Sequence, residues 1–248
     1  MLSSLLERRS VRRFKPKPVS KKLLNVMIRA GQRAPTSCGT QFYSLIEISD
    51  VRKRKAIIKI TGRNRALESA PVWIFVCCDA ARPAMMFQML KIDWHLGELT
   101  RLIHGLIDAS LAAENMVTAA ELLGLSSVFT IYHWKALREI SRLLRLPAGV
   151  LPVLLLCIGY PDEKPPLRPR LSTGTIHHEN RYRLPTRQML LRDYVKSNRS
   201  LVRMSYFGGD VRDLAQHWQR KFRTEEMVSR EKKLRMELRR LGFLPSKL

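Results

Sequence analysis

The residues near the N-terminus that could do chemistry are arginines gathered around one serine. Within six positions the chain surrounds Ser10 with Arg8, Arg9, Arg12 and Arg13. Guanidinium groups bind phosphate through forked, charge-assisted hydrogen bonds, and a neighbouring hydroxyl adds a further donor. This stretch therefore suits three roles: a phosphate pocket, an arm that binds nucleic acid, or a targeting signal.

A second pair of arginines lies far along the chain, in the sequence PPLRPRL. The prolines favour an extended conformation here, and residues two apart on an extended chain point to the same side. Arg168 and Arg170 should therefore face one direction. Two distant arginine clusters of this kind suit a single phosphate group held between them.

The cysteines and histidines predict neither a metal site nor a disulfide. None of the four cysteines has CxxC spacing, and the adjacent His177 and His178 have no second Cys/His pair nearby. Cys77 and Cys78 lie in an apolar run that reads as a strand, so their side chains should point to opposite faces. We expect reduced, mostly buried thiols in a cytoplasmic protein.

The net charge of +24 predicts attraction to polyanions, without distinguishing nucleic acid, acidic lipid and phosphorylated small molecules. The C-terminal helix EKKLRMELRRLGF lacks the interleaved aromatic residues that stack on bases, and its glutamates can pair with neighbouring cations, so we do not favour nucleic acid or an acidic membrane as a partner. No apolar run approaches the ~20 residues of a membrane-spanning helix. Glu7 and the prolines at 16 and 18 argue against an N-terminal targeting signal.

The spacing of apolar residues predicts helices and strands in alternation. Helices are expected at 2–9, 19–32, 51–60, 101–123 and 135–146, with Ser20 as a cap. Strands are expected at 42–50, 71–80, 125–133 and 150–160. The segments 33–41 and 61–70 read as loops, and residues 85–95 fit no single pattern.

The composition changes after about Pro185. Residues 187–248 hold 16 Lys or Arg against 7 Asp or Glu, and they contain two helical patterns. We expect residues 1–185 to form a cofactor-binding domain. Residues 186–248 should form a basic helical C-terminal extension that packs on that domain or on a partner subunit, since its apolar positions are too sparse for a core of its own.

Several stretches, in order, resemble those of one known family. They are ERRSVRRFKPKPVS, RAPTSCGTQFYSLIEI, ESAPVWIFVCCD, GYPDEKPPLRPRL and IHHENRY. Over about residues 5–183 the chain is similar to the FMN-dependent nitroreductase-like flavoproteins. The resemblance implies an α+β fold, in which helices flank a central, mostly antiparallel sheet. It also implies a homodimer that binds FMN at the subunit interface.

The resemblance assigns cofactor-binding roles to three sets of residues. The FMN phosphate and ribityl chain should be held by Arg8, Arg9, Ser10 and Arg12, joined by Arg168 and Arg170. A loop that lines the flavin should contain Pro35, Thr36, Ser37, Gly39 and Gln41. Further contacts are expected from Asn64 or Arg65, and from the backbone of Thr130 and Ile131.

The activity implied by the resemblance is NADH- or NADPH-dependent reduction of a nitroaromatic, a quinone or a similar small electron acceptor. Flavin N5 would carry the hydride in two half-reactions, so no catalytic side chain is expected. Two alternatives stay open: a flavin-fold protein with little turnover that binds polyanions, and a dedicated flavoenzyme such as a dehalogenase. Phe42-Tyr43 replaces the family's Pro-Trp, and Thr130, Ile131 and Tyr132 replace a small residue, so the pocket should be narrower.

Overall fold

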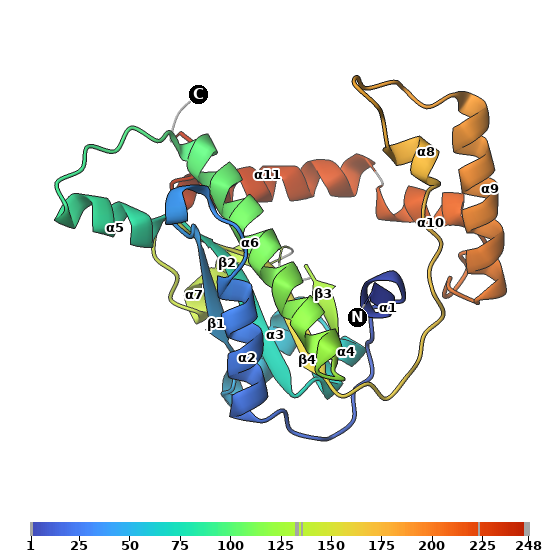
Figure 1. The fold of residues 1–248 in the computed structure, drawn as a ribbon, viewed down its shortest axis with the longest axis horizontal. Coiled ribbons are helices and arrows are strands. Elements are labelled where there is room, and N and C mark those ends of the chain that lie inside the picture. Colours follow the sequence, from blue (N-terminus) through green and yellow to red (C-terminus); the bar gives the residue numbers. More distant parts are fainter. Residues whose placement is uncertain (1, 132–133, 135, 223, 246–248) are drawn as a thin grey trace. The chain divides into compact units, whose positions relative to one another are not determined.

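The computed structural model describes residues 2–131, 134, 136–222 and 224–245 (Figure 1). The chain divides into two compact units. One consists of residues 1–165 together with 230–248, and the other of residues 166–229. The sequence predicts that residues 1–185 bind the cofactor and that residues 186–248 form an extension. That assignment stays a prediction.

A four-stranded sheet forms the centre of the first unit. Its strands are β1 (Tyr43–Glu47), β2 (Val72–Asp79), β3 (Ser126–Thr130) and β4 (Val150–Gly159), and they lie in the order β1-β2-β4-β3. Every neighbouring pair is antiparallel, which confirms the predicted α+β fold. Proline cannot donate to a strand ladder, and Pro152 of β4 accordingly lies opposite Cys77, where the pairing register shifts.

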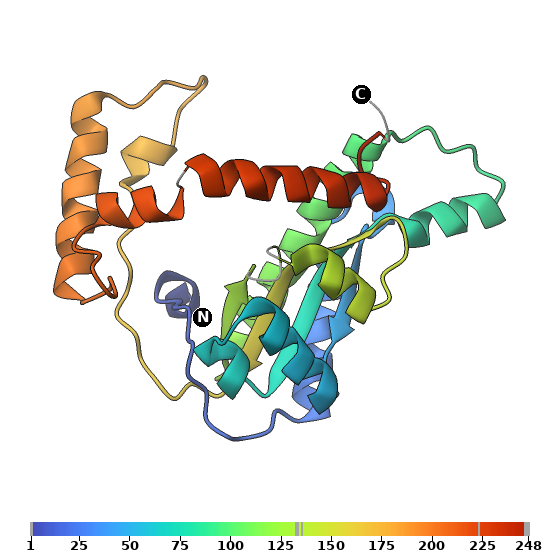
Figure 2. The same cartoon turned by 180° about the vertical axis from the view of Figure 1, so that it is seen from behind.

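Helices cover both faces of this sheet. In Figure 1 the near face carries α2 (Lys21–Gln32) and α6 (Glu98–Leu122), and Figure 2 shows α3 (Val51–Thr61), α4 (Arg65–Ser69) and α7 (Leu137–Leu143) on the other. Each face has its own buried apolar cluster. Cys78 belongs to one and Cys77 to the other, which confirms that their side chains point to opposite faces.

Close packing between α6 and β2 depends on one glycine. A methyl group at Gly105 would overlap the Cys78 sulfur and would lie 3.2 Å from the Phe42 carbonyl oxygen. The missing side chain therefore lets α6 approach the sheet. The same helix turn carries Asp108, whose side chain is buried beside the loop before β1.

Local capping explains where the elements begin. The Ser20 side chain accepts from the Leu23 N–H at the start of α2, as predicted. The expectation of a loop over 61–70 is wrong in part, because the Asn64 side chain caps the short α4. Residues 85–95, which fit no single pattern, include most of α5 (Ala81–Met89). The predicted ends at 132, 133 and 135 lie outside the described residues.

The second unit contains α8 (Thr173–Ile176), α9 (Arg187–Arg203) and α10 (Leu214–Lys221). The buried Asp193 carboxylate of α9 accepts hydrogen bonds from the Ser172 N–H at 2.9 Å and from the Thr175 hydroxyl at 2.6 Å. These bonds lower the Asp193 pKa, and the hydroxyl of Thr175 contributes most. They hold the segment around α8 against α9.

The end of the chain packs in the first unit. The helix α11 (Thr224–Arg240) leads to Leu241 and Phe243, which are buried in the cluster formed around α2 and α6. The Leu241 carbonyl accepts from the Gly149 N–H at 2.7 Å, just before β4. Among the helices that the structure describes, none has the length and apolar character needed to cross a membrane.

Candidate functional site

The N-terminal arm, residues 8–15, is fixed by its backbone. Ser10 forms a parallel bridge with Ser127 of β3, and the Val11 N–H donates to the Ser127 carbonyl at 3.1 Å. Further along, the Lys15 N–H donates to the Tyr160 carbonyl at 2.9 Å. The backbone of the arm is therefore held by β3 and by the residue that follows β4. This fixes the directions in which successive side chains of the arm point.

One carboxylate orients the middle of this arm. Glu163 Oε1 accepts the backbone N–H of Arg12 at 2.6 Å and that of Arg13 at 3.1 Å. The Arg13 guanidinium pairs with Asp162, at 3.2 Å between Nε and Oδ2. Within the described part of the chain, Arg8, Arg9 and Arg12 form no such ion pair. Arg13 is thus committed to the fold, whereas the other three cations remain available to an anion.

A cavity of about 400 Å³ lies beside the arm, lined by residues that include Glu7, Arg9, Lys15 and Glu121. Arg9 Nε is buried there and has no hydrogen-bond partner among the described residues. Burial raises the Glu121 pKa, against the opposing charge of Arg8. The rise favours the uncharged carboxyl group, which repels a bound anion less. An unpaired buried guanidinium N–H is a donor that a phosphate oxygen would satisfy.

The loop before β1 is organised by Asp108, which is 3% exposed. Its Oδ2 accepts the Thr36 hydroxyl at 2.6 Å and the Phe42 N–H at 2.8 Å. The Thr36 oxygen in turn accepts the Gln41 N–H at 3.0 Å. One carboxylate from α6 therefore closes the loop at both ends.

Arg82 holds the same loop from its other side. Its guanidinium donates to the backbone carbonyls of Gln41 and of Tyr43, the latter at 3.1 Å. Inside the loop, Cys38 and Gln41 adopt left-handed backbone conformations, with φ of 52° and 51°. Such conformations are costly for residues other than glycine, and they persist where the surroundings determine them. The Asp108 and Arg82 contacts supply that determination, so the loop is preorganised.

The remaining predicted residues lie at the start of α4, at the end of β3 and in the second unit. Asn64 caps α4 by accepting the Ala66 N–H at 2.8 Å, and Arg65 is exposed beside it. Thr130 is buried at the end of β3, and Ile131 is 60% exposed. Thr130 therefore has no exposed side chain to offer a ligand, and the role of its backbone and of that of Ile131 stays a prediction.

Arg168 and Arg170 belong to the second unit. The Arg168 guanidinium stacks on the Tyr206 ring at 4.5 Å, and Arg170 Nη1 donates to the Pro169 carbonyl at 3.1 Å. The structure thus brings together Arg8, Arg9, Ser10 and Arg12 on one arm, and Pro35 to Gln41 in one loop. Convergence of the arm with Arg168 and Arg170 on a phosphate stays a prediction.

Sequence reasoning missed the residues that position the arm and the loop. Glu163 and Arg82 gave no signal, because their partners are backbone groups distant in sequence. Asp108, by contrast, gave a signal in the sequence. It is a lone carboxylate on the apolar face of a long helix, between Gly105 and Ala112, and a buried charge needs partners.

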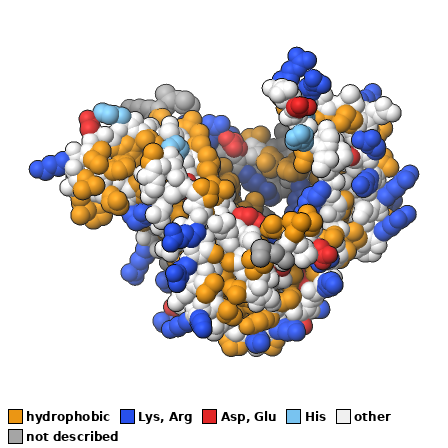
Figure 3. Space-filling model, in the orientation of Figure 1, with side chains coloured by type: hydrophobic (Ala, Val, Ile, Leu, Met, Phe, Trp, Pro, Cys, Tyr) orange, Lys and Arg blue, Asp and Glu red, His pale blue; other side chains and the backbone are white. Residues whose placement is uncertain are grey.

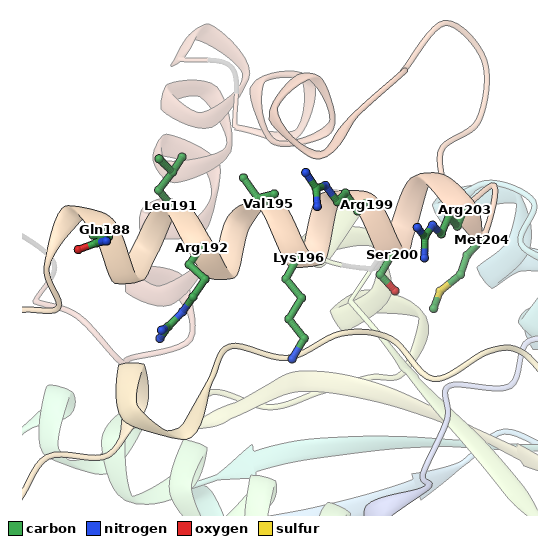
Figure 4. A pocket seen from close by; sticks show the side chains of 9 residues that line it. All are labelled: Gln188, Leu191, Arg192, Val195, Lys196, Arg199, Ser200, Arg203 and Met204. Carbon is green, nitrogen blue, oxygen red and sulfur yellow. The ribbon is translucent and has the colours of Figure 1, made fainter.

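A larger hollow, of about 800 Å³, lies along α9 in the second unit (Figure 4). It is lined by Gln188, Leu191, Arg192, Val195, Lys196, Arg199, Ser200, Arg203 and Met204. None of these residues was predicted to bind the cofactor. The size of the hollow alone does not make it the site, since the predicted contacts lie elsewhere.

Comparison with known proteins shows that the arm and the loop lie within a stretch that matches a known family. The model of the Nitroreductase family matches residues 5–63 and 58–160. An oxygen-insensitive NADPH nitroreductase from Salmonella typhimurium is 34% identical over 187 residues, which cover 75% of each chain.

Two solved structures resemble the whole chain. Nitroreductase A from Vibrio parahaemolyticus has a TM-score of 0.82 at 26% identity, covering 97% of this chain and 96% of that one. The NADPH:FMN oxidoreductase from Vibrio harveyi, complexed with NAD⁺, has a TM-score of 0.77 at 25% identity, covering 94% and 96%. The sequence match and the shared fold lead to one conclusion: this chain belongs to the nitroreductase family.

Proposed function

We propose that the protein is an FMN-dependent oxidoreductase that uses NADH or NADPH to reduce a nitroaromatic, a quinone or a similar small acceptor. The observation that carries the proposal is the family match over residues 5–160, which includes both the arm and the preorganised loop. Related proteins are named as an NADPH nitroreductase and an NADPH:FMN oxidoreductase. When bound, FMN supplies the hydride chemistry, accepting two electrons from the nicotinamide and delivering them to the acceptor.

The arm is proposed to hold the FMN phosphate and ribityl chain. Arg8, Arg9 and Arg12 would bind the dianion, with the Ser10 hydroxyl as a further donor and with Arg168 and Arg170 completing the site. The buried, unpaired Nε of Arg9 supports this role, because a phosphate oxygen would give it the partner that it lacks. Glu163, by fixing the backbone of Arg12, sets the direction from which this guanidinium approaches.

The loop is proposed to line the flavin ring through Pro35, Thr36, Ser37, Gly39 and Gln41. Because the Thr36 hydroxyl is used by Asp108, its contribution would come from its backbone and methyl group. The side-chain oxygen Oδ1 of Asn64 already caps α4, so the side-chain NH₂ of the same residue would donate to the ring, beside Arg65. Backbone N–H groups at Thr130 and Ile131 would approach the ring from β3.

A homodimer is proposed as well. On α6 a row of exposed apolar side chains recurs every four residues, at Leu99, Ile103, Ile107 and Leu111. Their exposed fractions are 58%, 48%, 52% and 39%. Figure 3 shows apolar side chains on the face over α5 and α6. An exposed apolar row of this length is the kind of surface that a second copy covers.

A cytoplasmic location is proposed from the cysteines. Cys38, Cys77, Cys78 and Cys157 are free thiols, and proteins of oxidising compartments tend to pair theirs. Burial raises the pKa of Cys78 and of Cys157 to about 12, so these two thiols are unreactive at neutral pH. They are part of the core and not of the chemistry.

Release and identification of the cofactor test the proposed function. Protein purified with added FMN should be yellow, should release FMN on heating, and should lose its flavin absorbance on anaerobic addition of NADPH or NADH. Subsequent addition of a nitroaromatic or a quinone should restore the flavin absorbance. A colourless preparation that neither binds FMN nor oxidises NAD(P)H would contradict the proposal.

A further inference from the structure

Four cations form one ridge along α9. Arg192, Lys196, Arg199 and Arg203, here called the α9 ridge, are all exposed. At about 100° per residue they fall within a sector of roughly 60° around the helix axis, and they span about 16 Å along it. All four line the hollow of about 800 Å³ (Figure 4).

Little carboxylate charge compensates the α9 ridge: Asp193 interacts electrostatically with Arg192, and no salt bridge joins the two. Within the part of the chain that the structure describes, none of its four cations forms a salt bridge. The one acidic residue of α9, Asp193, lies outside the sector, is buried, and is bonded to Ser172 and Thr175. The basic helix α11 differs, because there Glu231 pairs with Arg235 at 2.7 Å.

A row of like charges that form no salt bridges lowers the stability of the protein when no ligand is bound. Cations three or four residues apart on a helix repel each other and destabilise it. The α9 ridge contains three such successive pairs. A feature that weakens the unliganded helix is more easily explained by a ligand that neutralises it than by the needs of the fold.

The rest of α9 keeps the α9 ridge facing outward. Leu201 and Asp193 are buried, and the Asn198 side chain accepts the Leu214 N–H at 2.8 Å. Tyr194 lies 6.0 Å from the Trp218 ring of α10. These contacts fix the helix by its other faces, so the backbone holds the four cations within one sector of α9.

We propose that the α9 ridge binds the phosphodiester backbone of nucleic acid. A row of evenly placed cations matches a row of phosphates, whereas a small phosphorylated molecule would engage only one or two of them. An acidic membrane fits less well, because the sector of the α9 ridge contains no apolar side chain to enter the lipid. Leu191 and Val195 only border it.

The proposal predicts how steeply the binding constant falls as the salt concentration rises. We would titrate a fluorescently labelled single-stranded oligonucleotide with the full-length, FMN-saturated protein and follow anisotropy at several salt concentrations. Each phosphate neutralised on a single strand contributes about 0.7 to the slope of log K against log salt, so the α9 ridge should contribute about 2.8. A duplex of the same sequence provides the second arm, at about 0.9 per phosphate.

A glutamine variant separates binding from folding. Arg192→Gln/Lys196→Gln/Arg199→Gln/Arg203→Gln should reduce the slope by about 2 to 3 and weaken binding at least tenfold at low salt. Its Tm without nucleic acid should be equal to or above that of the wild type, because repulsion is removed. Arg192→Lys/Arg199→Lys/Arg203→Lys keeps the charge and should keep the slope.

A control variant tests whether binding depends on where the cations lie or only on how many there are. Arg52, Lys55 and Lys59 form a shorter exposed row on α3, so their triple glutamine variant should leave the slope largely unchanged. The triple variant Arg192→Gln/Lys196→Gln/Arg199→Gln should reduce it by about 2. Equal losses from both rows would overturn the proposal. Ridge-dependent binding to anionic phospholipid vesicles without binding to either oligonucleotide would overturn it too.

Discussion

At the scale of single residues, two carboxylates carry the most information about the candidate site: the buried Asp108 and the half-buried Glu121. Asp108 ties both ends of the loop before β1 to α6. Glu121 lies in the cavity beside the arm with one oxygen unpaired among the described residues. Neither is predicted to touch the reacting atoms. Both act on the residues that would hold the cofactor, and each can be tested on its own.

Replacing Asp108 should loosen the loop. Asp108→Ala leaves the Thr36 hydroxyl and the Phe42 N–H without their buried acceptor, which costs about 1–3 kcal/mol. We expect weaker FMN binding and a changed flavin spectrum, whereas Asp108→Asn keeps an acceptor oxygen and should restore most of both. Urea unfolding and FMN titration measure the two effects.

The control for this change is Glu237→Ala, which removes a buried carboxylate that pairs with Arg240 on the same helix. It should lower stability without altering the spectrum of bound flavin. If Asp108→Ala left FMN affinity and the flavin spectrum untouched, Asp108 would have no role in positioning the loop.

Glu121 predicts a dependence of stability on pH. Burial raises its pKa in the folded protein above the ordinary value of 4.5, so folding favours the protonated form. Its contribution is complete below 4.5 and is lost as pH rises through the raised pKa. In FMN-free protein, Glu121→Gln should therefore unfold at higher denaturant than the wild type at neutral pH, and the gap should close towards pH 4. A gap that is constant with pH would contradict this assignment.

At the scale of helices and strands, periodicity located most elements of the first unit, but the helical patterns found after residue 185 did not include α9. The helices α2, α3 and α6 and all four strands follow the predicted apolar patterns, because each buries one face or both faces in the first unit. The helix α4 escaped notice because five residues are too few for a periodic pattern, although Asn64 is a typical cap.

The candidate site was only partly predictable for a related reason. The arginines and the loop were visible as residue types in a familiar order. Their positions depend on backbone bonds to Glu163 and Arg82, which are 151 and 41 residues away in sequence. No local pattern encodes contacts of that range, so the sequence indicated candidate binding residues and not what holds them in place.

The contact between α6 and β2 yields a prediction at this scale. Gly105→Ala would place a methyl group on the Cys78 sulfur and force α6 away from the sheet, at a cost of about 1–3 kcal/mol. Because Asp108 moves with α6, FMN binding should weaken as well. Gly208→Ala is the control, since its methyl group meets no atom within 4 Å. Equal denaturation midpoints for both variants would rule out this packing constraint.

At the scale of the whole molecule, the proposed dimer depends on the exposed row of α6. Ile107→Glu places a charge in the middle of that row, and we expect it to shift the protein towards monomers. Sedimentation velocity over a range of concentrations measures this, with Val51→Glu on α3 as the control for an added surface charge. A wild-type protein that is monomeric at high concentration would contradict the proposed assembly.

The central proposal is that Arg12 of the arm and Arg168 both bind the phosphate of FMN. The most direct test compares the affinities of FMN and riboflavin, which differ by that phosphate, for the wild type and for Arg12→Ala/Arg168→Ala. We predict that the wild type prefers FMN by at least about tenfold, or 1.4 kcal/mol, and that the double variant loses most of this preference while still binding riboflavin. An unchanged preference for FMN in the double variant would contradict the account.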